Sequence, residues 1–316
     1  MTVIRGMLPK SLVPGVHEFV GMSYGNTPEE HAPLYEMVKT NRAWEEEVML
    51  SGMGGAQDKA EGQAVTFDDI QETWTARYTV STVAIGFAVT KEAFDDDLYD
   101  NIARAKAQEL GQAMADTKQV KAAAVFNRAF NTSYLGGDGK PLCSATHPTS
   151  SGTDFDNAYA VDFSESALED ICINVSLMTN DRGILKSAQT KSLHIPAQLE
   201  FVANRILKAE YSGISGTTGA LIRNAAGSEN VGGLLMQPNL VAARLPGGVH
   251  INRRFTDTDA WFIRTSVPNG TKMFIREGLS GSEDVDFLTD NMLFKFRERY
   301  GFGWTDPRQW QGSEGA

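Results

Sequence analysis

The feature that most constrains this chain is a strand–loop–strand stretch that runs directly into a long helical segment. Residues 43–50 (AWEEEVML) and 72–90 (ETWTARYTVSTVAIGFAVT) have strand-like composition, and a glycine-rich tip, residues 51–65, follows the first run. A two-stranded ribbon alone is only marginally stable in water, so its large apolar side chains need another surface to pack against. The order of the segments predicts that a second copy of the chain supplies this surface. A shell-building subunit is therefore favoured over an enzyme.

The residues expected to contact the second copy are aromatic and β-branched members of the two runs. In the second run, Trp74 and Val80 occupy even-numbered positions, whereas Val83 and Phe87 occupy odd-numbered positions. Side chains alternate along a strand with a period of two, so this change predicts a bulge or bend near Ser81 and Thr82. The predicted contact set is Trp44, Trp74, Tyr78, Val80, Val83, Ile85 and Phe87.

The helical segment begins near Thr90 and extends to about Asn131. Small and apolar residues recur at steps of three and four, and no proline occurs from 92 to 130. A helix of roughly 35–40 residues would be about 50–60 Å long, which is typical of a structural spine. Gly111 is a position at which it could kink. The predicted buried face comprises Ala103, Ala107, Leu110, Met114, Thr117, Val120 and Ala124.

Residues 1–43 are expected to form an extended arm, because they contain four prolines and apolar residues without a stable period. One short helix is predicted at Glu29–Lys39, where Thr27 and Pro28 supply a cap and a first-turn proline. An arm without its own core is expected either to be mobile or to lie on a neighbouring chain. It has no continuous apolar segment of the kind found in signal peptides. No run in the chain approaches the roughly 18 apolar residues that span a bilayer.

The rest of the chain predicts shorter elements. A helix capped by Ser164 should extend to about Thr179, and the final run, 284–299, alternates phenylalanine with lysine and arginine. We interpret this run as a half-buried strand with a basic face rather than a surface for stacking nucleic-acid bases. The other expectations are a strand and helix over 190–207, a glycine-rich loop at 211–233, and strands at 237–245, 259–266 and 271–277.

Charge and cysteine content exclude several classes of protein. A formal net charge of −11 argues against a dedicated nucleic-acid binder, which needs cations for the phosphates. Two cysteines, Cys143 and Cys172, are too few for a disulfide framework, so a reducing compartment is expected. Cys143 and His147 stand four residues apart, but no second ligand pair has metal-site spacing. We interpret both as structural residues and predict no catalytic group, metal or cofactor.

Short segments in a characteristic order carry a family resemblance. They are GFAVTKE at 86–92, DDDLY at 95–99, VFNRAF at 125–130, GGDGKPLCS at 136–144 with His147 and Pro148, LHIP at 193–196 and DTDAWF at 257–262. In this order, the chain resembles the major capsid proteins of tailed bacteriophages with the Hong Kong 97-type fold. The resemblance covers most of the chain from about residue 40 onward.

The resemblance implies an α+β fold with a spine helix and five segments. These are an N-terminal arm (1–43), an extended hairpin or E-loop (44–91), a peripheral domain with the spine helix (92–180), an axial domain (181–274) and a return to the peripheral domain (275–316). It also implies hexamers and pentamers that form an icosahedral head around double-stranded DNA without sequence-specific binding. Assembly is expected in the host bacterial cytoplasm, with a separate scaffolding protein, a portal and a decoration protein as partners. Some relatives cross-link their hairpins covalently, but for Lys59 non-covalent locking is expected.

Three alternative functions remain to be considered for this chain. An encapsulin-like nanocompartment shell would have the same fold around a cargo enzyme. A cytosolic enzyme would place its site near Cys143 and His147. A decoration or tail protein is disfavoured by the long helix and the length of the chain.

Overall fold

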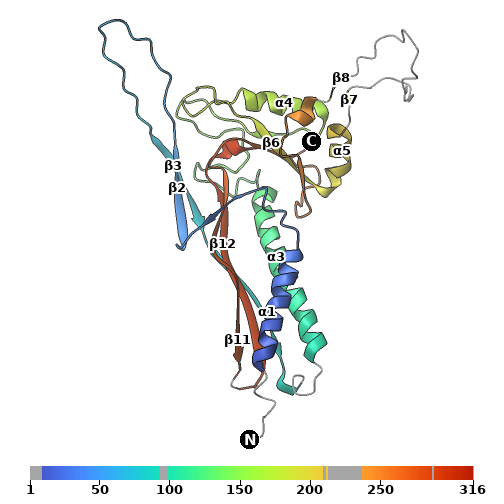
Figure 1. Ribbon diagram of the computed structural model, residues 1–316. Coiled ribbons are helices and arrows are strands. Elements are labelled where there is room, and N and C mark those ends of the chain that lie inside the picture. The colour runs from blue at the N-terminus through green and yellow to red at the C-terminus, as the bar shows by residue number, and fades with distance from the viewer. Residues whose placement is uncertain are drawn as a thin grey trace, which may run out of the picture.

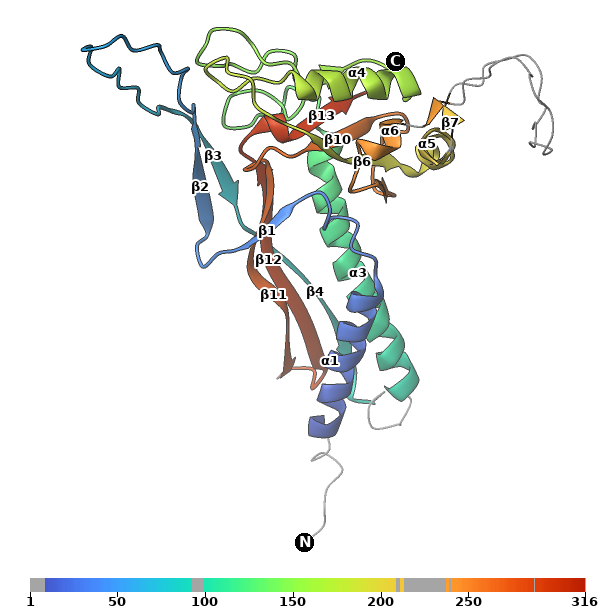
Figure 2. The same ribbon diagram turned by 45° about the horizontal axis from the view of Figure 1, so that its top comes forward.

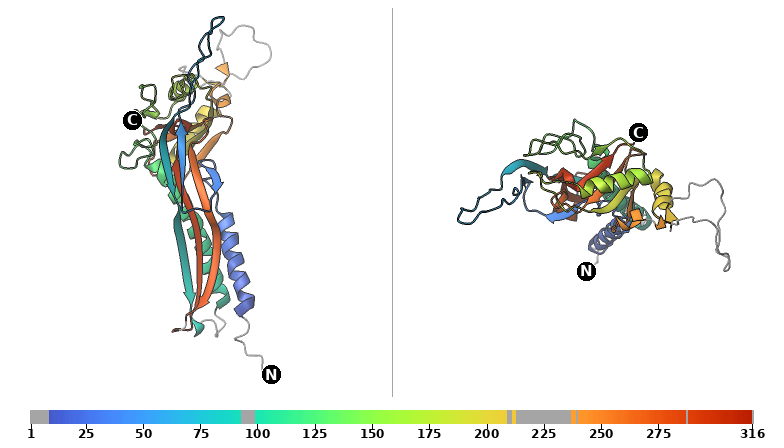
Figure 3. Two further views of the ribbon diagram at one scale, coloured as in Figure 1. Left: turned by 90° about the vertical axis from the view of Figure 1, so that its left-hand side faces the viewer. Right: turned by 90° about the horizontal axis from the view of Figure 1, so that it is seen from above.

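The computed structural model describes residues 9–92, 99–208, 211–212, 237–238, 240–286 and 288–315. Two units are stacked end to end, and a hairpin protrudes at their junction (Figure 1). The elongated lower unit is a sheet covered on one face by two helices, as the side view in Figure 3 shows. None of the helices in these ranges combines the length and apolar character needed to cross a membrane.

The lower sheet has the strand order β1-β11-β12-β4. The pair β1–β11 is parallel, and the other two pairs are antiparallel. Two helices, α1 and α3, pack on the sheet. The bounds are α1 (Pro9–Asn26), β1 (Glu36–Lys39), β4 (Ser81–Val89), α3 (Tyr99–Asn127), β11 (Thr271–Val285) and β12 (Met292–Trp304).

The upper unit is a five-stranded sheet with the order β5-β13-β10-β6-β9, flanked by short helices (Figure 2). Its elements are β5 (Ala158–Tyr159), α4 (Glu165–Ser176), β6 (Thr190–Pro196), η2 (Ala197–Leu199), α5 (Glu200–Leu207), α6 (Leu240–Ala243), β9 (Val249–Asn252), β10 (Trp261–Thr265), η3 (Pro307–Gln309) and β13 (Trp310–Ser313). A two-stranded pair, β7 (Tyr211–Ser212) and β8 (Gln237–Pro238), brackets a segment outside the described residues.

The domain boundaries expected at 180/181 and 274/275 stay a prediction, although the elements on either side of them pack together. Leu168 and Ile171 of α4 pack in one core with Leu193 of β6 and Trp261 of β10, so α4 belongs to the upper unit. β11 and β12 lie in the lower sheet, but β13, which follows β12 in the chain, lies in the upper sheet. The chain therefore crosses between the units again after β12.

A second core joins the two units. Phe126 of α3 packs edge-on against Trp310 of β13 and Phe262 of β10, with ring centroids 4.7 and 5.3 Å apart. Leu34 and Tyr35, which precede β1, are fully buried in the same core. Because its aromatic rings come from both sheets, this core fixes the upper unit on the spine.

The N-terminal arm differs from its prediction. Residues 9–26 form α1, whereas the predicted helix at Glu29–Lys39 is a series of turns followed by β1. Val16 and Val20 of α1 are buried against α3 of the same chain. This part of the arm therefore packs on its own chain, and its contact with a neighbour stays a prediction. Two prolines and three glycines within α1 hide its periodicity, so only the contact with α3 reveals it.

Helix α3 confirms the predicted spine but differs from the prediction in its details. Its described length is 29 residues, and the segment 93–98 before it lies outside the described residues. The predicted buried face is right at Ala107, Leu110 and Met114 but drifts afterwards, because Val120 is 50% exposed. The helix continues through Gly111 without a break. A Cβ atom at this position would lie 2.5 Å from the Val20 carbonyl oxygen, so the glycine provides space for α1.

Most of the remaining elements follow the sequence pattern. The Ser164 side chain caps α4 by accepting a hydrogen bond from the Ala167 amide, as predicted. Phe294 and Phe296 of β12 are buried while Lys295 and Arg297 are exposed, which confirms the half-buried strand. The strand predicted at 237–245 is wrong over 240–243, which form α6. The glycine-rich loop predicted at 211–233 lies mostly outside the described residues.

Candidate assembly surface

The hairpin consists of β2 (Trp44–Leu50) and β3 (Glu72–Thr79), and it points away from the lower sheet (Figures 1 and 2). The strands are antiparallel, with Trp44 opposite Thr79. This agrees with the first predicted run to within one residue. The connecting loop, residues 51–71, is longer than the predicted tip. We call these 21 residues the hairpin tip.

The root of the hairpin is held by its own chain. Glu47 of β2 accepts hydrogen bonds from Lys272 Nζ at 2.6 Å and from Thr305 Oγ1 at 2.9 Å. Trp74 Nε1 of β3 donates to the Thr305 carbonyl oxygen at 3.2 Å, and the Tyr78 hydroxyl bonds to the Thr305 hydroxyl. These partners come from β11 and the end of β12, so the root is fixed on the body and sets the direction of the tip.

Two members of the predicted contact set are buried at this anchored root. The Tyr78 side chain is 1% exposed and packs edge-on against Phe274 at 4.8 Å between ring centroids. Val80 is 9% exposed. Both side chains are therefore buried largely by their own chain, and their contact with a second copy stays a prediction. Their partners are distant in sequence, and the strand pattern cannot separate internal from external burial.

The second predicted run forms two strands, which belong to different sheets. Val80 separates β3, which pairs with β2, from β4, which pairs along its length with β12. The predicted bend near Ser81 is therefore confirmed as the point where the chain leaves the hairpin. Val83 and Phe87 are half-buried toward the helix layer, with Phe87 stacked on Phe294 at 5.1 Å between ring centroids.

The other predicted contacts remain accessible. Trp44 is 43% exposed and Ile85 is 42% exposed, while Trp74 is half-buried. The Arg77 guanidinium lies over the Trp44 ring, 4.5 Å from its centroid. The contact of Trp44, Trp74, Val83, Ile85 and Phe87 with another chain stays a prediction.

The hairpin tip exposes large apolar side chains that are not members of the predicted contact set. Phe67 is 94% exposed, and Val65 and Met53 are 61% and 57% exposed. Ile70 is 48% exposed. Contiguous exposed apolar patches mark interaction surfaces in soluble proteins, so the hairpin tip is a candidate surface of this kind. The sequence contains one signal for this surface, because these large apolar residues occur in a loop that otherwise consists mainly of small, polar and charged residues. Lys59 is exposed in the same loop.

The base of the hairpin tip is tethered to the loop that follows α4. The Asp68 carboxylate accepts a hydrogen bond from the Gly54 amide at 2.6 Å and another from Arg182 Nη2 at 2.6 Å. The Asn180 side-chain amide donates to the Met53 carbonyl oxygen at 3.5 Å. The Gly54 amide, followed by the Arg182 charge, lowers the pKa of Asp68. The tether is exposed to solvent, so it can open at little cost.

Cys143 and His147 do not form a reactive pair. Cys143 is 2% exposed, and burial raises the pKa of its thiol well above the ordinary value. His147 uses both ring nitrogens, with Nδ1 at 2.5 Å from Asp138 and Nε2 at 3.0 Å from Asn157. Asn157 also donates to three backbone carbonyl groups, one of them that of Trp310. These contacts agree with the structural interpretation, and no cluster of metal-ligating side chains occurs among the described residues.

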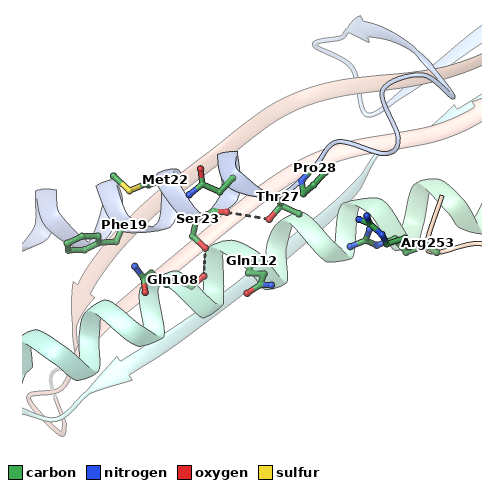
Figure 4. Close-up of a pocket in the computed structure, with 10 residues that line it drawn as sticks. Phe19, Met22, Ser23, Thr27, Pro28, Gln108, Gln112 and Arg253 are labelled. Atoms are coloured by element: carbon green, nitrogen blue, oxygen red, sulfur yellow. Dashed lines mark hydrogen bonds between the residues drawn. The ribbon is translucent and has the colours of Figure 1, made fainter. Parts of the chain in front are cut away.

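A groove of about 700 Å³ lies between α1 and α3 (Figure 4). Phe19 of α1 and Gln112 of α3 line it, and Ser23 Oγ donates to the Gln108 carbonyl oxygen at 2.7 Å. Arg253 borders the groove and forms an ion pair with Glu30 at 3.2 Å. The groove therefore follows the helix–helix contact and presents no group of side chains suited to catalysis.

The combination of spine helix, long two-helix-backed sheet, second sheet and protruding hairpin defines a class of shell subunits. The structure is similar to the capsid of cyanophage P-SCSP1u, with a TM-score of 0.54, 11% identity, and coverage of 90% of this chain and 86% of the other. It is similar to the procapsid protein of bacteriophage JBD30, with a TM-score of 0.53, 13% identity, and coverage of 98% and 76%. It is also similar to a virus-like particle from Pyrococcus furiosus, with a TM-score of 0.51, 10% identity, and coverage of 95% and 98%. These likenesses establish the Hong Kong 97-type fold.

The sequence carries the identification one step further. The profile of the family described as "Phage capsid protein" matches residues 72–311, which is more than half of the chain. The chain belongs to this family, and it is a major capsid protein, the structural subunit of a phage head. No curated protein matches the sequence.

Proposed function

We propose that copies of this chain form hexamers and pentamers that close into an icosahedral head around double-stranded DNA. The observation that carries the proposal is the hairpin, whose root is bound to its own chain while its tip exposes Phe67, Val65 and Met53. A tip that projects from one side of a molecule and binds elsewhere on the next makes a heterologous contact. Contacts of this type close into rings when the rotation permits.

The negative charge of the chain supports a container rather than a DNA-binding protein. A net charge of −11 disfavours tight binding to phosphates, so enclosed DNA would not adhere to the wall. We therefore propose a structural role without enzymatic activity and without sequence-specific DNA contacts. The packing of Cys143 and His147 supports the same proposal.

The fold class supports a set of assembly partners. We propose that a separate scaffolding protein, a portal and a decoration protein act with this chain in the host bacterial cytoplasm. We also propose that non-covalent contacts hold neighbouring hairpins together. Lys59 forms no covalent cross-link in this proposal. Denaturing electrophoresis of particles checks the last point, because ladders above the monomer mass would contradict it.

Expression alone and together with the neighbouring genes tests the proposed function. The expected result is closed particles by negative-stain microscopy, with nuclease-protected double-stranded DNA when the full set of genes is present. A chain that stays monomeric at high concentration under all of these conditions would contradict the proposal.

A nanocompartment shell is the second candidate. The likeness to the Pyrococcus furiosus virus-like particle, which covers nearly the whole of both chains, keeps this candidate open, but the family match supports a phage head more strongly. Purified particles that contain a cargo enzyme and no protected DNA would support this alternative over a phage head.

A further inference from the structure

Three side chains, Asp138, His147 and Asn157, form a chain of hydrogen bonds that we call the buried latch. His147 Nδ1 lies 2.5 Å from Asp138 Oδ2, and His147 Nε2 lies 3.0 Å from Asn157 Oδ1. The side chains of His147 and Asp138 are 1% and 2% exposed, and Asn157 is fully buried. Polar groups with so little exposure must satisfy their hydrogen bonds within the protein, so their partners reveal where the protons are.

The orientation of the Asn157 side-chain amide is fixed by backbone groups. Its Nδ2 donates to three carbonyl oxygens at 2.9, 3.1 and 3.0 Å, those of Leu142, Pro307 and Trp310. Its Oδ1 accepts a hydrogen bond from the Ser144 amide at 2.8 Å. The reversed amide would place an oxygen against three carbonyl oxygens and an amino group against an N–H group. Asn157 therefore turns its oxygen toward His147, and His147 Nε2 must carry a proton to donate to it.

The contact between His147 and Asp138 holds one further proton. With only Nε2 protonated, the ring would turn a bare Nδ1 lone pair toward an ionised carboxylate, and two acceptors would face each other at 2.5 Å. A proton between the two atoms replaces this repulsion with a charge-assisted hydrogen bond. Imidazole is the stronger base of the two groups, so the ring carries the proton and the contact is a buried ion pair.

The other titratable groups around the latch do not replace this proton. Cys143 is buried, and burial raises the pKa of its thiol, so the thiol stays neutral. Arg308 pairs with Asp181, and Asp156 is exposed to solvent. Lys140 donates its backbone amide to the latch carboxylate at 3.1 Å. Within the described part of the chain, none of these side chains forms an ion pair with a member of the latch.

The turn around Asp138 connects the latch to the root of the hairpin. A Cβ atom at Gly137 would lie 2.7 Å from the Thr75 carbonyl oxygen, so the turn touches β3 backbone to backbone. The Gly136 amide closes the turn by donating to the Lys140 carbonyl oxygen at 2.7 Å. Because Asp138 lies in the middle of this turn, its bond within the latch holds the turn against β3.

We propose that the proton shared by Asp138 and His147 makes the buried latch a pH-sensitive brace for the hairpin root. With the proton in place, the ion pair holds the turn against β3. When rising pH removes the proton, the two acceptors repel each other and the turn releases β3. Asn157 donates to the Trp310 carbonyl oxygen of β13, so the brace also connects the hairpin root with the upper sheet.

Folding takes up a proton at this site above about pH 6.5. In the unfolded chain, histidine titrates near its ordinary pKa of about 6.5, and aspartate is already ionised at that pH. The folded latch keeps a proton that the unfolded chain has released. Stability therefore falls as the pH rises above about 6.5, and the equilibrium constant for unfolding increases by up to about tenfold per pH unit.

Asp138→Asn tests the shared proton, because it replaces an acceptor with a group that carries its own hydrogens. The introduced amide can donate to a bare Nδ1, so the bond survives with a neutral ring. The matched control is Asp156→Asn, which neutralises an exposed carboxylate in the same region. In denaturant titrations from about pH 7 to about pH 9, the unfolding constant should rise less steeply in Asp138→Asn than in the wild type and the control. Equal slopes in all three proteins would overturn the proposal.

Hydrogen exchange in the wild-type protein tests the release of the hairpin root and needs no variant. After correction for intrinsic exchange rates, protection of residues 72–79 should fall from about pH 7 to about pH 9, while protection of α4 changes less. In Asp138→Asn, the two segments should respond to pH alike. A wild-type root whose protection does not change, or changes only as much as that of α4, would overturn the proposal. Both measurements use unassembled subunits, so their outcome is independent of shell formation.

Discussion

At the residue scale, one buried ion pair connects α1, α3 and β12. Lys118 Nζ lies 3.1 Å from Glu298, whose side chain is 1% exposed, and also bonds to the Tyr24 hydroxyl. Removing one partner of a buried pair leaves an uncompensated charge and typically costs about 3–5 kcal/mol. We expect Lys118→Met to lower the free energy of unfolding by about 3 kcal/mol in denaturant titrations. Lys118→Met with Glu298→Gln should lose less, and an equal or larger loss would contradict this role.

Buried histidines predict that the protein loses stability in mild acid. Burial lowers the pKa of His194 well below 6.5, and it lowers the pKa values of His250 and His31. His194 stacks on His250 at 4.9 Å between ring centroids, and Arg264 adds a further positive charge near both. The unfolded chain therefore binds more protons than the folded one as the pH falls below about 6.5, which favours unfolding.

We expect the stability lost between pH 7.5 and 5.5 to be smaller in His194→Gln than in the wild type. One proton of difference corresponds to about 1.4 kcal/mol per pH unit, so thermal midpoints at several pH values will resolve the effect. An unchanged pH dependence in the variant would contradict the assignment to His194.

At the scale of elements, the contact between α1 and α3 depends on a glycine. Alanine at position 111 would normally favour a helix by about 1 kcal/mol, but here its Cβ atom would lie 2.5 Å from the Val20 carbonyl oxygen. Because backbone must move to relieve this contact, we expect Gly111→Ala to lower the thermal midpoint. The matched control is Gly21→Ala in α1, which has open space around it and should be neutral or stabilising. A stabilising Gly111→Ala would show that the close approach is absent.

The tether at the base of the hairpin predicts a local effect. Asp68→Asn weakens the bond to Arg182 and removes the charge that both donors stabilise, so the hairpin tip should become more mobile. We expect faster proteolysis within residues 51–71 and faster exchange of the Gly54 amide in the unassembled protein, with no change in global stability. Asp69→Asn is the neighbouring control. Equal behaviour of the two variants would argue against the tether.

Local signals predicted the elements whose stability is local. The Ser164 cap, the alternation of Phe294 and Phe296 and the bend near Ser81 depend on neighbouring residues, and each agrees with the structure. Helix α1 was missed because its packing site is the notch at Gly111, far along the chain. Val120 was misplaced because an alanine-rich helix offers several faces of similar composition.

At the scale of the whole molecule, the main difference from expectation is where the first ninety residues find their partners. The arm and the hairpin root pack on their own chain, through Val20, Leu34 and Tyr78. Among the described residues of this region, the hairpin tip, Trp44 and Ile85 remain exposed for contacts with other copies. A strand pattern reports that a side chain is buried, but it does not report which chain buries it. Contact of the predicted residues with other copies therefore stays a prediction, and the exposed tip adds candidates that the strand pattern does not indicate.

The central claim is that the hairpin tip joins one subunit to the next. A cryo-electron microscopy map of assembled particles, with residues 44–79 traced in each subunit, tests it most directly. We predict that Phe67 contacts a neighbouring subunit in every ring, while α1 stays packed against α3 of the same subunit. Hairpin tips that stand free in solvent, or that fold back onto their own subunit throughout the shell, would contradict it.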